Sequence, residues 1–429
     1  MTRARTGGSD RPAGVRPLLA AGMLMLGVSP IIAVGTSAGA ATAPGVTSTS
    51  IRLGMPWLDL AALQSIGLTL NQGSYPDSIT ALADNINAHG GINGRKIIPY
   101  FASVNPTSTA SSASACTQLT QDDSVFVAIG PLYPLCYQEA GVATINGDMG
   151  ASTSPNLAQN FTWTPPPSAF DPLQLSVFSK MDVFKGKKVG VVSASVDQAE
   201  TPVVLAALKK LHVDVAESAV DSAPQGDTTA SNQDVQIIAQ KFENAGVSVV
   251  VGVGTGASAF LTGLNDDQST YTPRLVATNY SDFAGTVSAK GGDNPTYLKG
   301  ALTATTVPSQ QVIWNDPAIQ KCVHIIEKAY PSVAIGNPID APANAPTTWV
   351  APENSCEYMA LFDDIVKAAG KNLTEKSFQN AAYSLHDVSI PGIGTMSFDG
   401  RPYALGPVYL VTYDAATQKE VIANKSSAG

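Results

Sequence analysis

The pattern of hydrophobic and polar positions from residue 78 to residue 101 predicts a helix, a tight turn and a strand in one continuous run. Four apolar residues of the first half fall at i, i+3, i+4 and i+7, the spacing that lines one helical face. These residues are Ile79, Leu82, Ala83 and Ile86. The Gly-Gly pair at 90–91 tolerates the left-handed backbone that ends a helix, and the Asn-Gly pair at 93–94 tolerates positive φ in a turn. With strand patterns at 50–56 and 96–101, the sequence predicts a βαβ unit.

Strand and helix patterns continue to alternate along the chain, which is typical of a mostly parallel sheet. Further strands are predicted at residues 124–129, near Met149, and at 188–193, 213–219, 247–253, 274–277 and 407–413. Further helices are predicted at residues 115–120, 137–146, 171–184, 201–211, 234–245, 257–265, 316–330 and 355–370. Loops at 130–134 and 151–155 follow strands. Because open α/β sheets bind ligands outside the carboxyl ends of their strands, both loops are expected beside a binding site.

The motif Asn-Ala-x-Gly-Gly-Ile-Asn-Gly-Arg at residues 87–95 resembles the signature of a known family. This family is the branched-chain amino-acid (Leu/Ile/Val-binding) type of ABC-transporter substrate-binding protein, which has the type I periplasmic binding fold. The order of predicted strands and helices is similar to that family from about residue 50 to the C-terminus. The resemblance implies an α/β fold with two Rossmann-like lobes and a hinge with three chain crossings, which closes on a small molecule.

A division of the chain follows from this resemblance and from the connecting segments. Three consecutive prolines make residues 161–167 stiff, so we place the first crossover between the lobes there. The expected parts are a signal peptide at 1–41, lobe one at 50–165 and 300–390, lobe two at 166–299 and 391–415, and a loose tail at 416–429.

The N-terminus has the order of features that marks an export signal: basic residues, an apolar run at 17–35, and small residues up to Ala43. The alternative is an uncleaved membrane anchor, since the apolar run approaches the ~20 residues that a bilayer requires. Pro30 and the alanine-rich exit favour cleavage. Because no Cys lies nearby, we expect no lipid anchor on an N-terminal Cys. The protein is predicted to be exported, at the cell surface, in the periplasm or secreted.

The composition is that of a folded protein with an acidic surface. Hydrophobic residues make up 44% of the chain and charged residues only 14%, which excludes a disordered chain. Removal of residues 1–41 takes away four Arg and one Asp, and so lowers the formal net charge from −9 to −12. This charge disfavours nucleic acid and anionic membranes as partners, although solubility alone also accounts for it.

Four cysteines lie in the exported part of the chain, and an even number in an oxidising compartment predicts two disulfides. Three connectivities are possible. We favour the pairing of sequence neighbours, Cys116–Cys136 and Cys322–Cys356, which would close loops of 20 and 34 residues. Each bridge should stabilise the fold by about 3 kcal/mol. No metal site is predicted, because there is no Cys-x-x-Cys and only His324 lies close to a cysteine.

Neither catalysis nor a cofactor is predicted. None of the histidines adjoins a nucleophile-elbow pattern; they are His89, His212, His324 and His386. The glycine-rich residues 252–256 follow a strand and precede a helix, but they lack the spacing of nucleotide-binding loops. We expect these glycines to permit a sharp turn, with Thr255 at the edge of a binding cleft.

The resemblance also indicates ligand contacts in lobe one, where the family grips an amino-acid carboxylate with hydroxyls and backbone N–H groups. The best-matched positions are Ser152, Thr153 and Ser154. Ser and Thr also commonly cap helices, which is the alternative role. Trp57, just after the first strand, would form an apolar wall or else a core aromatic. Tyr133 and Pro134 stand where the family often has small hydroxyl residues, so a ring there changes the shape of the pocket.

Lobe two departs from the family pattern. Gln198 lies where the family commonly has a Tyr-Gly pair. The family places an acid for the ligand ammonium after the strand at 274–277, where this chain has Tyr280 and Asp282, and Asp282 is the candidate. Alternatively, Tyr280, Tyr133 and Trp57 surround an aromatic, terpenoid-like or otherwise less charged molecule.

Together these features predict an exported, non-enzymatic solute-binding protein that captures an amino acid or a related, less charged organic solute. The resemblance implies an ABC importer, with permease and ATPase subunits as partners. Two alternatives stay open: a ligand-sensing receptor ectodomain on the same fold, which a long membrane helix would support, and a secreted α/β hydrolase. The hydrolase would need a nucleophile, a base and an orienting acid in one pocket.

Overall fold

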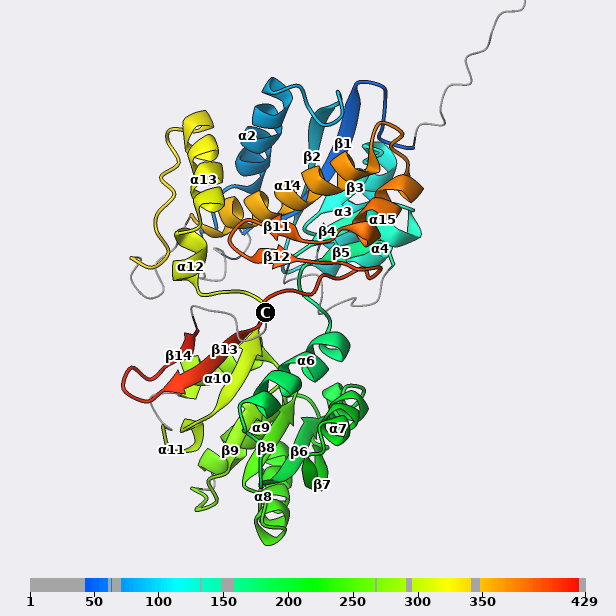
Figure 1. Cartoon of the computed structure of the whole chain (residues 1–429). Helices are drawn as coiled ribbons and strands as arrows, with labels where there is room; N and C mark the ends of the chain where they lie inside the picture. Colours follow the sequence, from blue (N-terminus) through cyan, green and yellow to red (C-terminus); the bar gives the residue numbers. More distant parts are fainter. Residues whose placement is uncertain are drawn as a thin grey trace, which may run out of the picture. The chain divides into compact units, whose positions relative to one another are not determined.

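The computed structural model describes residues 43–60, 63, 71–131, 133–147, 158–266, 268–290, 295–340 and 348–423. The predicted signal peptide at residues 1–41 lies outside these ranges. Within them the chain forms two sheets of mainly parallel strands, each flanked by helices, and a two-stranded hairpin (Figure 1). We refer to the two sheets with their helices as lobe one and lobe two.

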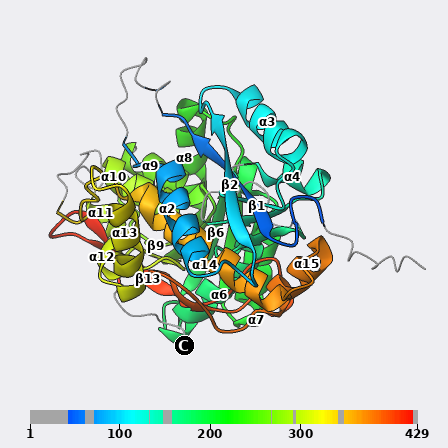
Figure 2. The same ribbon diagram turned by 90° about the horizontal axis from the view of Figure 1, so that it is seen from above.

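The sheet of lobe one has five parallel strands in the order β2-β1-β3-β4-β5. They are β1 (Ser50–Leu58), β2 (Lys96–Val104), β3 (Val127–Ile129), β4 (Ala143–Asn146) and β5 (Asn160–Thr162). β1 and β2 pair along their whole length, and Figure 2 shows them side by side. The βαβ unit predicted from residues 50–101 is therefore confirmed.

Helices cover both faces of this sheet, because alternate residues of a strand point to opposite sides. On one face, Ile51, Leu53 and Met55 of β1 share a hydrophobic core with four helices. These are α2 (Tyr75–Ala88), α13 (Pro317–Ala329), α14 (Val350–Ala369) and α15 (Glu375–Ser384). On the other face, Val104 and Ala128 lie in a smaller core under three short elements. These are α3 (Thr109–Thr117), the π-helical turn η1 (Gln118–Asp122) and α4 (Pro134–Glu139).

The turn that leads into β2 has the predicted geometry. Gly91, with a φ of +70°, lies just past the end of α2. Asn93 and Gly94 have φ values of +52° and +83°, the left-handed backbone that such a tight turn needs. Ile92 and Arg95 exchange two backbone hydrogen bonds across them. Local sequence therefore determines where β2 begins.

The sheet of lobe two has seven strands in the order β14-β13-β10-β9-β8-β6-β7. They are β6 (Lys188–Ala194), β7 (Asp214–Asp221), β8 (Val249–Val253), β9 (Arg274–Ala277), β10 (Leu302–Thr305), β13 (Tyr409–Asp414) and β14 (Lys419–Ile422). β13 pairs antiparallel with both of its neighbours, and the other pairs are parallel. The predicted mostly parallel sheet is confirmed here too.

Helices again cover both faces. One core packs on α6 (Pro167–Lys180) and α7 (Thr201–Lys210) and contains Val191 of β6. The next residue, Val192, belongs to the core of the opposite face. That core packs on α8 (Thr228–Asn244), α9 (Gly256–Asp266) and α10 (Tyr280–Lys290). Two short elements complete the lobe: η2 (Ser195–Asp197) and α11 (Pro295–Leu298). The short helix α12 (Gln310–Trp314) follows β10 and packs against the core of lobe one.

Sheet membership shows that the chain passes between the lobes three times: after β5, after β10 and before β13. The predicted boundaries need three corrections. β10 lies in lobe two, so this lobe extends beyond residue 299. The hairpin of β11 (Val388–Ile390) and β12 (Gly394–Met396), with Phe398, belongs to the core of lobe one, so the assignment of 391–406 to lobe two is wrong. β14 pairs with β13, so residues 416–429 are not all a loose tail.

The helix predicted at 137–146 is also wrong. α4 ends at Glu139, and Gly141 turns the chain with a φ of +76°. Residues Ala143–Asn146 then form β4, a fully buried strand between β3 and β5, where β-branched side chains are favoured. The strand predicted near Met149 lies outside the described residues.

Both favoured disulfides are formed. Cys116–Cys136 joins α3 to α4 with a Cα–Cα distance of 6.4 Å. Cys322–Cys356 joins α13 to α14 with a Cα–Cα distance of 6.0 Å. Both distances lie in the usual range for a disulfide, and both bridges lie within lobe one.

Candidate functional site

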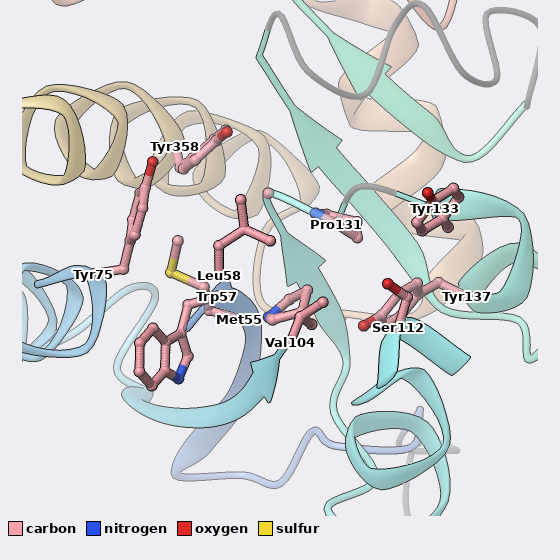
Figure 3. A pocket seen from close by; sticks show the side chains of 12 residues that line it. Met55, Trp57, Leu58, Tyr75, Val104, Ser112, Pro131, Tyr133, Tyr137 and Tyr358 are labelled. Carbon is pink, nitrogen blue, oxygen red and sulfur yellow. The ribbon is translucent and has the colours of Figure 1, made fainter. Parts of the chain in front are cut away.

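A pocket lies at the carboxyl ends of the first three strands of lobe one (Figure 3). In the strand order β2-β1-β3-β4-β5, the direction in which strands are added reverses between β1 and β3. Open α/β sheets bind ligands at such a switch point. The cavity itself is small, about 30 Å³, and lies within about 540 Å³ of empty space that includes open solvent. Its position in the fold and its mostly apolar lining are those of a small-molecule site.

Aromatic and aliphatic side chains line this pocket, which we call the tyrosine pocket. Its described lining residues are Met55, Pro56, Trp57, Leu58, Tyr75, Val104, Ser112, Gly130, Pro131, Tyr133, Tyr137 and Tyr358. Figure 3 shows Tyr75 and Tyr358 on one side, and Ser112, Tyr133 and Tyr137 on the other. Segments far apart in sequence therefore meet here: the end of β1, the start of α2, α3, α4 and α14.

Local structure holds each ring in place. Tyr75 begins α2 after the Ser74 N-cap, and its hydroxyl oxygen accepts a hydrogen bond from Asn354 Nδ2 at 2.9 Å. The Tyr358 ring packs on Trp163 at 5.4 Å between ring centroids. A Cβ on Gly130, whose φ is +70°, would lie 3.3 Å from the Tyr358 ring. Glycine thus lets the end of β3 turn close to this wall.

Burial favours the neutral form of two tyrosines of this pocket, Tyr75 and Tyr137. Burial raises the pKa of Tyr75 to about 12; the Asn354 hydrogen bond lowers that pKa, and the charges of Glu357 and Glu353 raise it further. Burial likewise raises the pKa of Tyr137 above its ordinary value. Tyr137 is 2% exposed, and its hydroxyl has no hydrogen-bond partner among the described residues.

Lobe two has the same strand order around its own switch point, β7-β6-β8-β9-β10, and a second hollow lies there, of about 300 Å³. Its lining is more polar and includes Thr255, Ser258 and Asp221. Asp197 accepts hydrogen bonds from the Thr255 N–H at 2.7 Å and from its Oγ1 at 2.5 Å. A Cβ on Gly254 would lie 2.2 Å from the Asp197 carboxyl carbon, so this contact requires glycine. The predicted sharp turn at 252–256 thus positions Thr255.

The other lobe-two candidates lie near this hollow without lining it. Gln198 is exposed at the end of η2, and Tyr280 is half-buried at the start of α10. Asp282 accepts hydrogen bonds from Ser258 Oγ at 2.8 Å and from the Ser258 N–H at 3.2 Å. Burial raises the pKa of Asp282, while the hydrogen bonds from Ser258 lower it. The Asp282 carboxylate thus links helix α10 to helix α9 through hydrogen bonds.

The structure brings together only part of the predicted site. Trp57 and Tyr133 line the same pocket, Trp57 partly buried against the core and Tyr133 53% exposed. Pro134 is buried in the first turn of α4 and is not among the lining residues. The three best-matched positions of the second loop lie outside the described residues; they are Ser152, Thr153 and Ser154. Their contact with a ligand stays a prediction.

Sequence reasoning missed Tyr75, Tyr137 and Tyr358, three of the four tyrosines of the pocket. Tyr75 and Tyr137 had a usable signal, because each lies near the start of the helix that follows a strand, the region where open α/β sheets bind ligands. Tyr358 had none, because it lies in the middle of α14 and reaches the pocket only through the packing of lobe one.

A buried polar pair in lobe two was also missed. Gln174 Nε2 donates to Asp171 Oδ1 at 3.1 Å and to the Thr278 carbonyl at 2.7 Å. Burial raises the pKa of Asp171 to about 8; the charge of Glu200 adds to this shift, and the Gln174 hydrogen bond opposes it. The sequence signal was the polar pair at i and i+3 on an otherwise apolar helical face.

Two kinds of site are absent from the described part of the chain. No group of three His, Cys, Asp or Glu side chains there is placed to hold a metal ion. No helix in the described ranges is both long and apolar enough to cross a membrane.

The two lobes define the fold class: this is the type I periplasmic binding fold, as the resemblance implied. No family model matches the chain, and no curated protein matches it in sequence. Among solved structures it is similar to an ABC transporter substrate-binding protein from Desulfitobacterium hafniense, with 15% identity, a TM-score of 0.58, and coverage of 87% of this chain and 100% of that one.

Two further matches name a bound molecule. One is the branched-chain amino acid transporter substrate binding protein LivJ from Streptococcus pneumoniae, in complex with isoleucine, at 15% identity and a TM-score of 0.53 over 87% of this chain and 99% of that one. The other is an ABC transporter solute binding protein from R. palustris, in complex with benzoate, at 16% identity and a TM-score of 0.52 over 88% of this chain and 96% of that one. At this identity the likeness establishes the fold.

Proposed function

We propose that the protein is an exported solute-binding protein that captures a small organic molecule for an ABC importer. The observation that carries this proposal is the tyrosine pocket at the switch point of lobe one. Proteins of the same fold bind isoleucine and benzoate, which supports a small organic solute. The sequence pattern of an export signal supports a location outside the cytoplasm.

Capture on this fold works by closure of the two lobes around the solute. Lobe one would supply the tyrosine pocket, and lobe two would supply polar groups such as Thr255 and Ser258 at its own switch point. Closure completes the set of contacts only when solute is present, so the importer can distinguish loaded from empty protein. Permease and ATPase subunits are the partners that this function requires. The role is binding without turnover.

The proposal is tested by identifying the small molecules that stay bound to the purified protein. We expect mass spectrometry of the denatured protein to reveal one organic solute, and titration calorimetry to show that this solute binds one to one. Tyr133→Ala should retain less of it, since this half-exposed ring lines the pocket and its loss leaves the core intact. Ile237→Ala, at a residue 67% exposed on α8, is the matched control. Chemical conversion of the solute, or the absence of any bound solute, would contradict the proposal.

Thr153 provides a second prediction, carried over from the family resemblance. If its hydroxyl anchors a polar group of the solute as strongly as a hydrogen bond to a charged group, its loss removes about 1.5 to 3 kcal/mol of binding free energy. Thr153→Ala should then weaken binding about ten- to a hundredfold in a calorimetric titration, with an unchanged unfolding midpoint. Equal affinities of the variant and the wild type would remove Thr153 from the site.

A further inference from the structure

We infer that the tyrosine pocket receives an uncharged aromatic or apolar group that carries one hydrogen-bond acceptor, and that the Tyr137 hydroxyl donates to this acceptor. The inference rests on the proposed function, because it names the class of solute that the same pocket takes. It is carried by three features of the pocket wall: its charge, its backbone donors and its unpaired hydroxyl.

The charge of the wall argues against an ionised group in the pocket. None of its described lining residues is Asp, Glu, Lys, Arg or His. The acids whose charge is felt at Tyr75 are Glu353 and Glu357, which are buried on α14 and do not line the pocket. Burying a carboxylate or an ammonium without a partner is far more costly than burying a neutral group. The ammonium and carboxylate of a free amino acid therefore have no counter-charge here.

Prolines reduce the number of backbone donors that the described part of the rim offers to a carboxylate. Pro56, Pro131 and Pro134 each lack an N–H group at the strand end or loop that borders the pocket. The N–H of Gly130 already donates to the Ile145 carbonyl at 2.8 Å. In many α/β proteins such strand-end N–H groups hold anions. At three positions of the described rim a proline ring stands in place of such an N–H donor.

The Tyr137 hydroxyl is a buried polar group of the lining that a solute can satisfy. It is buried, lines the pocket, and has no partner in the part of the chain that the structure describes, whereas the Tyr75 oxygen accepts from Asn354. Because burial raises the pKa of Tyr137, its hydroxyl keeps its proton and acts as a donor. A buried donor without a partner is unfavourable, so an acceptor on the solute removes that penalty.

The rings around this donor suit a flat apolar group. Trp57 and Tyr133 are only partly buried, and Figure 3 shows them on different sides of the pocket. Aromatic rings attract other rings in stacked or edge-on geometry. Burial of apolar surface should stabilise the complex most at the ring of Tyr133, because the solute would cover surface that is now open to water.

Two neutral probes and two charged probes test the inference. Acetophenone carries a ring and a carbonyl acceptor, and α-methylstyrene has the same skeleton with a methylene in place of the oxygen. Benzoate and leucine are the charged probes. By calorimetry we expect the wild type to bind acetophenone three- to tenfold more tightly than α-methylstyrene, and to bind the charged probes more weakly than acetophenone. In Tyr137→Phe the two neutral probes should bind equally.

Tyr137→Phe should fold normally, because it removes a buried hydroxyl that has no partner, and its unfolding midpoint should equal or exceed that of the wild type. The matched control is Tyr271→Phe in lobe two, another buried tyrosine, whose hydroxyl donates to the Val247 carbonyl at 3.1 Å. This control should lower the midpoint and keep the preference for acetophenone.

Several results would overturn the inference: failure of both neutral probes to bind, tighter binding of leucine or benzoate, or a preference for acetophenone that survives in Tyr137→Phe. These failures are distinguishable from failure of the proposed function. A charged solute retained by the purified protein would contradict the inference and support solute capture. A protein that retains no solute would contradict solute capture itself.

Discussion

At the scale of single residues, burial decides the ionisation of Asp171 on helix α6. Asp171 is 1% exposed, and burial raises the pKa of its carboxyl to about 8 from an ordinary value of 3.8. At pH values between these two pKa values, Asp171 of the folded protein keeps a proton that the unfolded chain has lost. The free energy of unfolding should therefore fall as pH rises from about 4 to about 8, by up to ~1.4 kcal/mol per pH unit, and this stabilisation is intact only at the acidic end.

Asp171→Asn tests this contribution, because its amide stays neutral over the whole range and can still accept from Gln174. Urea unfolding at several pH values should show a flatter dependence in the variant than in the wild type. Asp182→Asn, which removes an exposed carboxylate paired with Lys185, is the control and should keep the slope of the wild type. Parallel curves for Asp171→Asn and the wild type would show that Asp171 ionises normally.

At the scale of elements, the two disulfides have different relations to the tyrosine pocket. Cys116–Cys136 joins α3 to α4, the helices that supply Ser112 and Tyr137. Cys322–Cys356 joins α13 to α14 over the core. Replacing either pair by alanine should lower the free energy of unfolding by about 3 to 4 kcal/mol. The decrease should be larger for Cys322–Cys356, which closes the longer loop. Loss of Cys116–Cys136 should weaken solute binding more than loss of Cys322–Cys356, because it frees two short helices that form a pocket wall, whereas α14, which carries Tyr358, stays packed in the core of lobe one.

Chemical denaturation and calorimetric titration of the two double variants separate these effects. The Cys322/Cys356 variant is the matched control for the Cys116/Cys136 variant, since it loses a bridge from the same lobe. Equal affinities in the two variants would show that the pocket does not depend on the bridge between α3 and α4.

At the scale of the whole molecule, the proposed function predicts that solute draws the two lobes together. Three passages of the chain connect the lobes, so they can move as units while each sheet keeps its own core. Small-angle X-ray scattering should show a smaller radius of gyration at saturating solute than without it. Tyr133→Ala at the same solute concentration should show a smaller change. An unchanged radius in saturated wild-type protein would contradict closure.

The sequence by itself determined the local elements and their order. The run at 50–101 predicted β1, α2, the turn at Asn93 and β2, because helical periodicity and turn geometry depend on residues a few positions apart. The strand at 274–277 was predicted without error, and both disulfides were predicted from proximity in sequence. The motif at 87–95 indicated the fold class, which the structure confirms.

Only the tertiary structure decided which sheet each late segment joins and which side chains form the pocket. The pairing of β10 with β9 and β13, and the placement of β11 and β12 in lobe one, depend on partners far away in sequence. Tyr75, Tyr137 and Tyr358 come from three helices that meet only when lobe one is packed. Short segments carry the same periodicity in either lobe, so long-range burial selects their place.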